Sequence, residues 1–591
     1  MALISDTNLK ETLEVIEAVA SVPTFSFGTR AIGSTRDRLI YHSNHGGPFT
    51  LWSVDVDGRT RFRIIPGPVE RMAEPRHDSN TVYFTKDMAK GGELHRIYCA
   101  DAVEGKESLI VDAPPMRIEG IASCGSLVAF TGATKEAVGL FTSKDGSFEK
   151  RQEVPPSAIL SDASEGLLVG SGNLAKNSRS MEIFIFDHSS GEYTEYTPKA
   201  GSVNKAPKIN GAKILFESDF TGRNRLHVFD PQSGELELAH FASEDYVEYS
   251  PVEHQNYGWT DDHKVWLIGK KEGECRIFVD GKALPSPPGY VVDMTLLNGK
   301  AYFIQTAVVQ PPRILESTPG VNGNREVLEN PPPPSISGRL GTGRMVRFPS
   351  FDDRTLSALV IDHGSRRRTV VLVHGGPWSE YPNVWGTIIC SVAASGYNVV
   401  APNYRGSTGY GEEFRLLDIG DPGGGDLKDV IAATDWAKKN GLATEIALMG
   451  YSYGGYITLL VLGKEPELWS CGFAGAPVTD WKEMYDMSDA MYREFIEVLF
   501  DRRMDLLDDR SPLTYVSNVG RPVCILSSQN DSRTPLKPVL RYVMELASHP
   551  GTFEFRALPD MGHKEGTVQD VVDSLVPGIA FLQNKFPPDV G

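Results

Sequence analysis

The chain has 591 residues, of which 40% are hydrophobic and 23% are charged, a balance typical of a folded globular protein. These proportions exclude intrinsic disorder and collagen-like repeats, and the length predicts more than one domain. The 77 acidic residues outnumber the 59 basic residues and give a net charge of −18. Because such a surface repels phosphate backbones and anionic lipid headgroups, we expect neither nucleic acid nor a membrane as a partner.

Six cysteines are scattered along the chain without a Cys-x-x-Cys pair, so the sequence predicts neither a disulfide framework nor a zinc site. The N-terminus carries acidic residues where a signal peptide needs an uninterrupted apolar segment. Apolar runs such as residues 369–373 and 456–462 are far too short to cross a bilayer. We therefore expect a cytoplasmic protein.

An amphipathic helix is expected near the N-terminus. Leu9, Leu13 and Ile16 share one face at helical spacing, and Asn8, with a glutamate three residues later, resembles a capping box. We expect this helix, within residues 1–22, to dock on a later domain.

From about residue 38 to residue 328 the sequence consists of short strands rich in Val, Ile, Phe and Tyr, separated by turn dipeptides such as Asp57-Gly58 and Asp280-Gly281. One apolar strand recurs about every 44 residues, a spacing typical of the four-stranded blades of a propeller. We interpret it as the first strand of each blade. The sequence thus predicts a seven-bladed β-propeller over residues 23–329, with two stacked β-sandwiches as the alternative. The seven copies begin at Leu39, Val82, Leu127, Leu167, Ile214, Val265 and Ala301.

A second domain is expected after the proline run of residues 330–335, which cannot pair inside a sheet and so predicts a linker. Over residues 336–591, short apolar strands alternate with helical stretches, as in the strand at 369–373 and the helix at 426–439. That alternation predicts a mostly parallel sheet with helices on both faces, as in the α/β-hydrolase fold.

The chemistry of this second domain centres on Ser452. It lies in the sequence Gly-Tyr-Ser-Tyr-Gly at 450–454, between an apolar strand at 446–449 and a helical stretch. This G-x-S-x-G pattern occurs by chance in many loops, but a strand before it and a helix after it are typical of a nucleophile elbow. Glycines flank the serine because the turn is too sharp for a side chain there.

A serine nucleophile needs a base, and the base needs a carboxylate to orient it. In this fold class they follow in the order Ser, Asp, His, each after a late strand. Asp531 and His563 occupy such positions, so we expect a catalytic triad with Ser452. Asp560 and His374 are rivals, but Asp560 reads as a turn residue and His374 precedes the nucleophile in the chain.

An oxyanion hole is expected from two backbone N–H groups. His-Gly-Gly-Pro at 374–377 follows a strand where an early loop of this fold contributes one donor, which we assign to Gly376. The second donor should be Tyr453, the residue after the nucleophile. A second His-Gly-Gly-Pro at 45–48 lies between two propeller strands without any elbow, so we interpret it as a turn.

Taken together, these motifs resemble the prolyl oligopeptidase family of serine peptidases, in its acylaminoacyl peptidase branch. They cover most of the last 250 or so residues, whereas the N-terminal half resembles that family in architecture alone. The resemblance rests on the residues at 374–377, 403–411, 450–456 and 530–535, and on the histidine after Asp-Met-Gly at 560–562.

The resemblance implies that the propeller caps the active site and limits access to short peptides. It also implies that Arg533 holds a substrate carbonyl, where a structural salt bridge is the alternative. Tyr492, Phe495 and Ile496 would line the first specificity pocket and favour an apolar or aromatic acyl residue. Without the resemblance, core packing would be the better interpretation of these three side chains.

Two neighbouring branches of the family fit less well. A dipeptidyl peptidase needs paired carboxylates in its propeller to bind a free amino terminus, and the only Glu-Glu pair, Glu412-Glu413, lies in the hydrolase domain. The prolyl branch uses a different oxyanion loop and a tryptophan pocket for proline. We therefore expect neither activity.

The resulting hypothesis is a serine hydrolase that cleaves short N-acylated peptides and releases an N-acylated amino acid. An esterase or an acyl hydrolase acting on a small metabolite is the first alternative, because a triad accepts esters as well as amides. A propeller interaction protein with a vestigial hydrolase domain is the second. The triad needs no metal and no organic cofactor. Enzymes of this kind often form dimers or larger assemblies, so a homo-oligomer is a further expectation.

Overall fold

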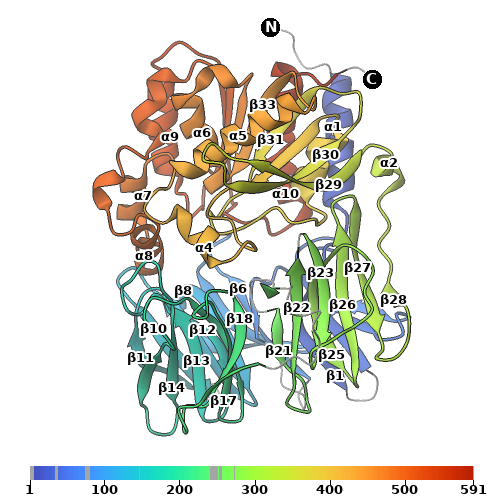
Figure 1. The fold of residues 1–591 in the computed structure, drawn as a ribbon, viewed down its shortest axis with the longest axis vertical. Helices are drawn as coiled ribbons and strands as arrows, with labels where there is room; N and C mark the ends of the chain where they lie inside the picture. The colour runs from blue at the N-terminus through green and yellow to red at the C-terminus, as the bar shows by residue number, and fades with distance from the viewer. Residues whose placement is uncertain are drawn as a thin grey trace.

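The computed structural model describes residues 6–33, 37–73, 80–144, 147–239, 250–251, 256–271 and 273–589. A β-propeller from the N-terminal half lies below an α/β domain from the C-terminal half, and the N-terminal helix joins the α/β domain (Figure 1). This architecture confirms the predicted combination of a propeller with a hydrolase domain.

The propeller has seven blades of antiparallel strands. Blades 1 and 2 contain β1 (Ser26–Gly33), β2 (Asp37–Ser43), β3 (Thr50–Asp55), β4 (Arg61–Arg63), and β5 (Met72–Ala73), β6 (Thr81–Asp87), β7 (His95–Asp101) and the start of β8 (Glu107–Cys124). Blades 3 and 4 contain the rest of β8, β9 (Leu127–Ala133), β10 (Val138–Lys144), β11 (Ser147–Val154), and β12 (Ile159–Ala163), β13 (Leu167–Gly172), β14 (Glu182–Asp187), β15 (Tyr193–Tyr196). Blade 5 contains β16 (Asn204–Asn210), β17 (Lys213–Ser218), β18 (Arg225–Phe229) and β19 (Leu236–Leu238). Blade 6 contains β20 (Ser250–Pro251), β21 (Tyr257–Trp259), β22 (Val265–Lys271), β23 (Glu274–Val279) and β24 (Lys282–Ala283). Blade 7 contains β25 (Tyr290–Leu297), β26 (Lys300–Ala307), β27 (Gln310–Ser317) and β28 (Arg325–Leu328).

The long strand β8 belongs to two blades. Its N-terminal part pairs with β7 through Ser108 and Leu109, and its C-terminal part pairs with β9 from Arg117 onward. Blades 2 and 3 therefore form one continuous seven-stranded sheet. At the other junction, β1 of blade 1 packs beside β25 of blade 7 and each pairs within its own blade. The ring thus closes by packing between blades 1 and 7.

The apolar strand that recurs along the sequence is the second strand of each blade, so its interpretation as the first strand was wrong. Within a blade the second strand has a neighbouring strand on each side and apolar blades on both faces, which gives a continuous apolar run such as that of β9. The first strands are more polar, for example β16 with the sequence Asn-Lys-Ala-Pro-Lys-Ile-Asn, and gave no such signal.

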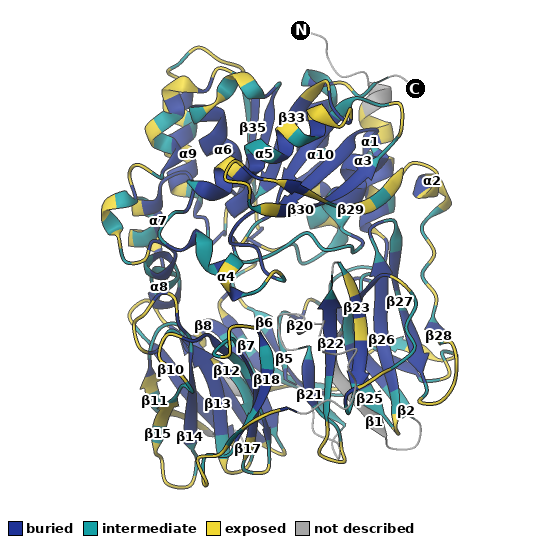
Figure 2. Ribbon diagram, in the orientation of Figure 1, coloured by how far each residue is buried: buried dark blue, intermediate teal, exposed yellow. Residues whose placement is uncertain are grey.

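The hydrolase sheet has eight strands in the order β29-β30-β32-β31-β33-β34-β35-β36. The last six of these are parallel to one another, whereas β29 and β30 pair in antiparallel fashion. Figure 2 shows central strands such as β33 and β35 buried beneath helices. The strands are β29 (Thr342–Pro349), β30 (Thr355–Asp362), β31 (Arg368–Val373), β32 (Asn398–Asn403), β33 (Glu445–Tyr451), β34 (Gly472–Gly475), β35 (Val523–Ser528) and β36 (Phe553–Leu558).

Alternate side chains of this sheet pack against different sets of helices. Val371 and Val373 belong to the core with α5 (Gly425–Lys439), α6 (Tyr453–Lys464) and α9 (Leu536–Leu546), whereas Val370 and Leu372 belong to the core on the opposite face. That opposite face is covered by α1 (Asp6–Ala20), α3 (Thr387–Ala394) and α10 (Val568–Lys585). The shorter helices are α2 (Pro334–Ser337), α4 (Glu412–Arg415), α7 (Trp481–Met487) and α8 (Ala490–Leu499), with 3-10 turns η2 (Leu416–Asp418), η3 (Pro466–Leu468), η4 (Met504–Leu506) and η5 (Pro512–Asn518).

The N-terminal helix α1 packs against α10 and α3 of the hydrolase domain, so it docks on a later domain as predicted. Ile16 is fully buried in that core, and Val19 is buried beside Trp385. Two details of the prediction were wrong. Leu9 is 43% exposed, beyond the end of the contact surface, and Asn8 lies inside the helix, which already begins at Asp6, so it is no cap.

Helix α2 begins at Pro334, inside the predicted linker, because proline at a first helical turn is already set to the helical φ. Close to the site discussed below, α8 docks on the propeller, where Ala490 and Met491 share an apolar cluster with Leu140 and Leu160. Within the described part of the chain, no helix is both long enough and apolar enough to span a bilayer.

Candidate active site

Ser452 lies at the tight turn between β33 and α6, immediately before the first residue of the helix. Its backbone has φ 58° and ψ −121°, a strained conformation for a residue other than glycine. The turn is held from both sides, since Ser452 N donates to Gly475 O at 2.9 Å and Tyr456 N donates to Ser452 O at 2.9 Å. Strand β34, which supplies Gly475, was absent from the predicted elements.

The glycines around Ser452 are required by close backbone packing. A Cβ on Gly450 would lie 2.2 Å from Gly454 O, and one on Gly454 would lie 2.0 Å from Val373 O. Helix α6 therefore approaches β31 and its own strand more closely than any side chain allows. This packing fixes the height at which Ser452 stands above the sheet.

The substitution Gly454→Ala is expected to lower the free energy of unfolding by about 3 kcal/mol or more, because its Cβ would collide with the backbone of β31. Urea denaturation followed by circular dichroism measures the change. Gly520→Ala serves as the matched control, since its nearest neighbour would be Asn518 O at 4.0 Å, and we expect a change within about 1 kcal/mol. Equal stability of the two variants would contradict the packing argument.

Three side chains that the sequence assigned to a triad form one chain of contacts. Ser452 Oγ lies 3.0 Å from His563 Nε2, and His563 Nδ1 lies 2.7 Å from Asp531 Oδ2. An ionised carboxylate only accepts hydrogen bonds, so Nδ1 carries the proton toward Asp531 and Nε2 is free to accept the hydroxyl proton of Ser452. This is the arrangement in which an imidazole can act as a general base toward a serine.

Asp531 is held as an anion although it is buried. Thr534 donates to both of its oxygens, from N at 2.8 Å and from Oγ1 at 2.8 Å, and Arg533 N donates at 2.9 Å. Burial alone would raise the pKa of Asp531, but His563 and these hydrogen bonds keep the pKa below its usual value. The carboxylate is therefore charged and oriented for contact with the imidazole.

The two rival residues lie in other environments. His374 is buried, its Nε2 is 2.8 Å from Ser407 Oγ, and its ring stacks on Tyr404 at a centroid distance of 4.1 Å. Burial lowers the pKa of His374 to about 4, so this imidazole is neutral and structural. Asp560 forms an exposed ion pair with Lys90 of the propeller at 3.1 Å.

The loop at 374–377 packs directly on the nucleophile. A Cβ on Gly375 would lie 3.2 Å from Ser452 Cβ, so a side chain there would displace the serine by a few tenths of an ångström. Gly376 follows with φ 123°, a value that side-chain-bearing residues rarely adopt. Tyr453 N is the first helical N–H of α6 and has no partner within the helix. Tyr453 N therefore adjoins Ser452, and Gly376 follows the glycine that packs against it, so the predicted pair of oxyanion donors stays a prediction.

The second His-Gly-Gly-Pro sequence, at 45–48, forms a turn between β2 and β3 of the propeller. It lies against the loop after His563, because Phe49 N donates to Gly566 O at 3.1 Å and Pro48 pairs with Thr567. The turn therefore joins the two domains.

Arg533 does not lie open to solvent but pairs with a carboxylate from the propeller. Its Nε donates to Glu93 Oε2 at 2.8 Å, and its second nitrogen bonds to the other oxygen of Glu93. Arg117 also binds Glu93, and its Nε donates to Asp489 at 2.6 Å. Burial would raise the pKa of Glu93, but the two arginines hold it far below its usual value. The structural salt bridge named as the alternative for Arg533 is therefore present.

The three predicted pocket residues on α8 have different surroundings. The ring of Tyr492 lies beneath the guanidinium groups of Arg117 and Arg533, at 4.6 and 5.8 Å. Phe495 meets Trp378, one residue beyond the 374–377 loop, edge to face at 5.4 Å. Ile496 is fully buried in the hydrolase core and exposes no surface to a ligand. Tyr492, Phe495 and Trp378 thus form the apolar surface between the oxyanion loop and Arg533.

Several residues of this site gave no signal in the sequence reasoning. Glu93 and Arg117 come from propeller loops and strands far from any motif, so only the folded chain brings them to the triad. Trp378 follows the 374–377 motif and could have been found by extending it by one residue, whereas Thr534 lies inside the 530–535 motif but was given no role.

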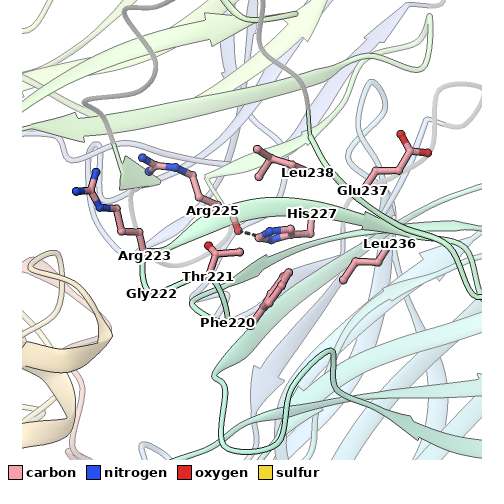
Figure 3. A pocket seen from close by; sticks show the side chains of 9 residues that line it. All are labelled: Phe220, Thr221, Gly222, Arg223, Arg225, His227, Leu236, Glu237 and Leu238. Carbon is pink, nitrogen blue, oxygen red and sulfur yellow. Dashed lines mark hydrogen bonds between the residues drawn. The ribbon is translucent and has the colours of Figure 1, made fainter.

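Two cavities lined by described residues lie away from the triad. A hollow of about 380 Å³ on blade 5 is lined by residues of β18, β19 and the turn before β18 (Figure 3). A larger cleft of about 1,090 Å³ lies between blades 5 and 6 and the hydrolase residues around β29 and Tyr410. Neither cavity includes a residue of the Ser452–His563–Asp531 chain.

Comparisons with known proteins agree with this geometry. Residues 52–315 match the family model described as the acylamino-acid-releasing enzyme-like N-terminal domain, and residues 385–588 match the prolyl oligopeptidase family. The chain is 24% identical over 561 residues to dipeptidyl aminopeptidase BIII of Pseudoxanthomonas mexicana, covering 89% of this chain and 75% of that protein. It is 30% identical over 384 residues to the acylamino-acid-releasing enzyme of Rattus norvegicus, covering 63% of this chain and 48% of that enzyme.

Solved structures share the fold at low sequence identity. A puromycin-hydrolyzing peptidase of Mycobacterium tuberculosis has a TM-score of 0.80 at 16% identity, with 97% of this chain and 95% of that chain covered. An acylaminoacyl peptidase in complex with Z-Gly-Gly-Phe-chloromethyl ketone has a TM-score of 0.70 at 16% identity, with 98% of each chain covered. With both parts matched by family models, this chain belongs to the prolyl oligopeptidase family of serine peptidases and resembles its acylaminoacyl peptidases.

Proposed function

We propose that this serine peptidase removes an N-acylated amino acid from the N-terminus of short peptides through an acyl-enzyme on Ser452. The observation that carries the proposal is the contact chain from Ser452 Oγ through His563 to Asp531. His563 takes the hydroxyl proton as Ser452 attacks the scissile carbonyl, and Asp531 stabilises the imidazolium that forms. The N–H groups of Gly376 and Tyr453 stabilise the oxyanion.

The intermediate then collapses, the C–N bond breaks, and His563 gives its proton to the leaving amine. In the second half of the reaction, which hydrolyses the acyl-enzyme, water takes the place of Ser452 as the nucleophile. His563 removes one of its protons, the hydroxyl attacks the acyl carbon, and Ser452 leaves with the proton returned by His563. The products are an N-acylated amino acid and a peptide shortened by one residue.

The surface beside the triad supports an apolar or aromatic acyl residue. Trp378, Phe495 and Tyr492 lie next to one another between the 374–377 loop and Arg533. Aromatic rings of this kind bind apolar side chains through burial of area and edge-to-face contacts. The ring of Tyr492 is also covered by guanidinium groups, which aromatic faces favour.

A neutral acyl terminus fits the charges near Arg533 better than a free ammonium group does. A second candidate function, aminopeptidase activity, is suggested by the name of the Pseudoxanthomonas relative and would need a carboxylate free to bind an amine. Glu93 is the carboxylate in this position, but Arg533 and Arg117 already bind both of its oxygens. Lys564 Nζ also lies 3.8 Å from Glu93 Oε1, so three cations already surround this carboxylate and compete with an ammonium group for it.

The test compares N-acetyl-phenylalanine p-nitroanilide, phenylalanine p-nitroanilide with a free amine, and a medium-chain p-nitrophenyl ester. We expect kcat/KM for the acetylated anilide to exceed that for the free amine by about tenfold or more, because the cationic environment disfavours a second positive charge. Faster cleavage of the free amine would favour the aminopeptidase. Cleavage of the ester without either anilide would favour a small-molecule acyl hydrolase.

A further inference from the structure

Two fully buried carboxyl groups lie behind the nucleophile elbow, and no motif accounts for them. Asp418 ends the turn η2, and Asp426 lies in the first turn of α5. Both residues are 0% exposed. No donor among the described residues reaches either oxygen of Asp418. Burial raises the pKa of Asp418, and the negative charge of Asp426 acts on this carboxyl and raises the pKa further.

Asp426 has the donors that Asp418 lacks. Leu427 N donates to it at 2.7 Å, Gly423 N at 3.1 Å, and the hydroxyl of Tyr453 at 2.6 Å. Its position at the start of α5 also favours a negative charge. Two ionised carboxylates cannot share a buried contact, because both are acceptors and both are negative. The proton between them therefore belongs to Asp418, and the charge to Asp426.

Neither carboxyl of this pair forms an ion pair with a cation among the described residues, and Lys464, whose charge acts on Asp426, makes no salt bridge with it. Arg405 binds Asp429 through two nitrogens at 2.8 and 2.9 Å, and Arg510 binds Asp421 at 3.0 Å. The remaining polar neighbours are the phenols of Tyr404, Tyr453 and Tyr456, whose pKa values burial raises well above the usual range. Among the described residues, no cluster of His, Cys, Asp and Glu is arranged to hold a metal ion. A proton is thus the species that neutralises the pair.

The direction of the pKa shifts agrees with this geometry. Burial and the contact with Asp426 raise the pKa of Asp418 well above its usual value. Burial raises the pKa of Asp426 to about 6, although the hydrogen bond from Tyr453 acts in the opposite direction. Since the two groups are coupled, they titrate as a pair that keeps one proton after the first is lost.

We propose that the proton shared by Asp418 and Asp426 fixes the side chain of Tyr453 and thereby aims its backbone N–H at the oxyanion. Asp418 and Asp426 are positioning residues that act through Tyr453 and do not touch the substrate. The inference rests on the proposed function in one respect, the role of Tyr453 N–H as an oxyanion donor. Loss of the shared proton at alkaline pH places two negative charges behind the elbow and loosens Tyr453.

The sign of the effect on stability follows from the raised pKa. A carboxyl group whose pKa is higher in the folded chain than in the unfolded chain stabilises the fold fully below the unfolded value, about 3.9 for aspartate. That stabilisation is lost as the pH rises through the folded value. Replacing Asp418 by a group that donates a hydrogen bond without titrating removes this loss.

The test compares the wild type with Asp418→Asn, whose amide donates to Asp426 at every pH. We expect the alkaline fall of kcat for N-acetyl-phenylalanine p-nitroanilide to move upward by about one pH unit or more, with KM little changed. The melting temperature of the variant minus that of the wild type should increase as the pH rises from 5 to 9. Asp421→Asn is the matched control, because this neighbour is paired with Arg510 and should shift neither profile upward.

An alkaline limb and a melting profile identical in the wild type and Asp418→Asn would overturn the inference. If the variant does not fold, infrared spectroscopy of the wild type decides, since a buried protonated carboxyl should keep its carbonyl band at pH 8, and absence of the band would also overturn the inference. The melting and infrared measurements do not depend on turnover, so they stand even if Ser452 is not the nucleophile.

Discussion

Replacing Ser452 by alanine is expected to lower kcat for N-acetyl-phenylalanine p-nitroanilide by about 10⁴-fold or more. The change removes only Oγ, the atom that lies 3.0 Å from His563 Nε2. The contact between His563 and Asp531 and the packing of the elbow glycines remain. Folding should therefore be preserved, which thermal unfolding of the two proteins measures.

Ser517→Ala is the matched control for this experiment. Ser517 lies exposed on η5, and among the described residues its hydroxyl has only a long contact of 3.5 Å with Asn518. We expect wild-type turnover from this variant. A fluorophosphonate probe should label the wild type and Ser517→Ala but not Ser452→Ala. Turnover of Ser452→Ala within tenfold of the wild type would place the nucleophile elsewhere.

The residues of the triad could be predicted because their signal is local. The turn from β33 to α6 needs glycines within two residues of Ser452, and Asp531 and His563 each follow a strand of the same sheet. Sequence order and the neighbouring strands were therefore enough to name them. Their mutual distances were not contained in the sequence and come from the parallel order of the strands.

The partner of Arg533 could not be predicted for the opposite reason. Glu93 lies 440 residues earlier in the chain, in a propeller turn whose sequence resembles many other turns. Its function depends on how the propeller docks on the hydrolase domain, which no local pattern encodes. The same holds for Arg117 of strand β8, whose guanidinium group donates to Ser532 Oγ of the hydrolase domain at 3.0 Å.

The number of blades could be predicted from the sequence, whereas the position of each strand within its blade could not. The repeat of about 44 residues is a property of each blade, so seven blades could be counted along the chain. Which strand of a blade is first depends on the order of strands around the ring. The strongest apolar signal came from the second strands, since neighbouring blades cover both of their faces.

Replacing Glu93 by glutamine is expected to destabilise the protein by about 3–5 kcal/mol, because it removes a buried carboxylate that both Arg533 and Arg117 bind. Because Glu93 is only 3% exposed, water cannot take its place and solvate the two arginines. Glutamine keeps the volume but offers one acceptor oxygen and one donor nitrogen to two cations. The free energy of unfolding from urea denaturation measures this loss.

Turnover should fall together with stability, since Arg533 adjoins Asp531 and faces Tyr492. We expect a higher KM for the acetylated anilide, because the freed arginine leaves the surface on which the acyl residue packs. A normal KM with lower stability would assign Glu93 to domain docking alone and show that the Arg533–Glu93 pair does not support the surface proposed to bind the acyl residue.

The difference in free energy of unfolding between the wild type and Glu93→Gln should also depend on pH, which gives an independent check. The pKa of Glu93 in the folded chain lies far below its value in the unfolded chain, because the effect of the arginines outweighs that of burial. The stabilisation that Glu93 contributes is therefore complete above about pH 4.3 and is lost progressively as the pH falls below that value. The gap between the wild type and Glu93→Gln should therefore narrow on acidification. Glu149→Gln, which breaks an exposed pair with Arg151 in the same propeller, should change stability by about 0.5 kcal/mol or less at any pH. A gap as small as that of the control would show that the buried network does not hold the two domains together.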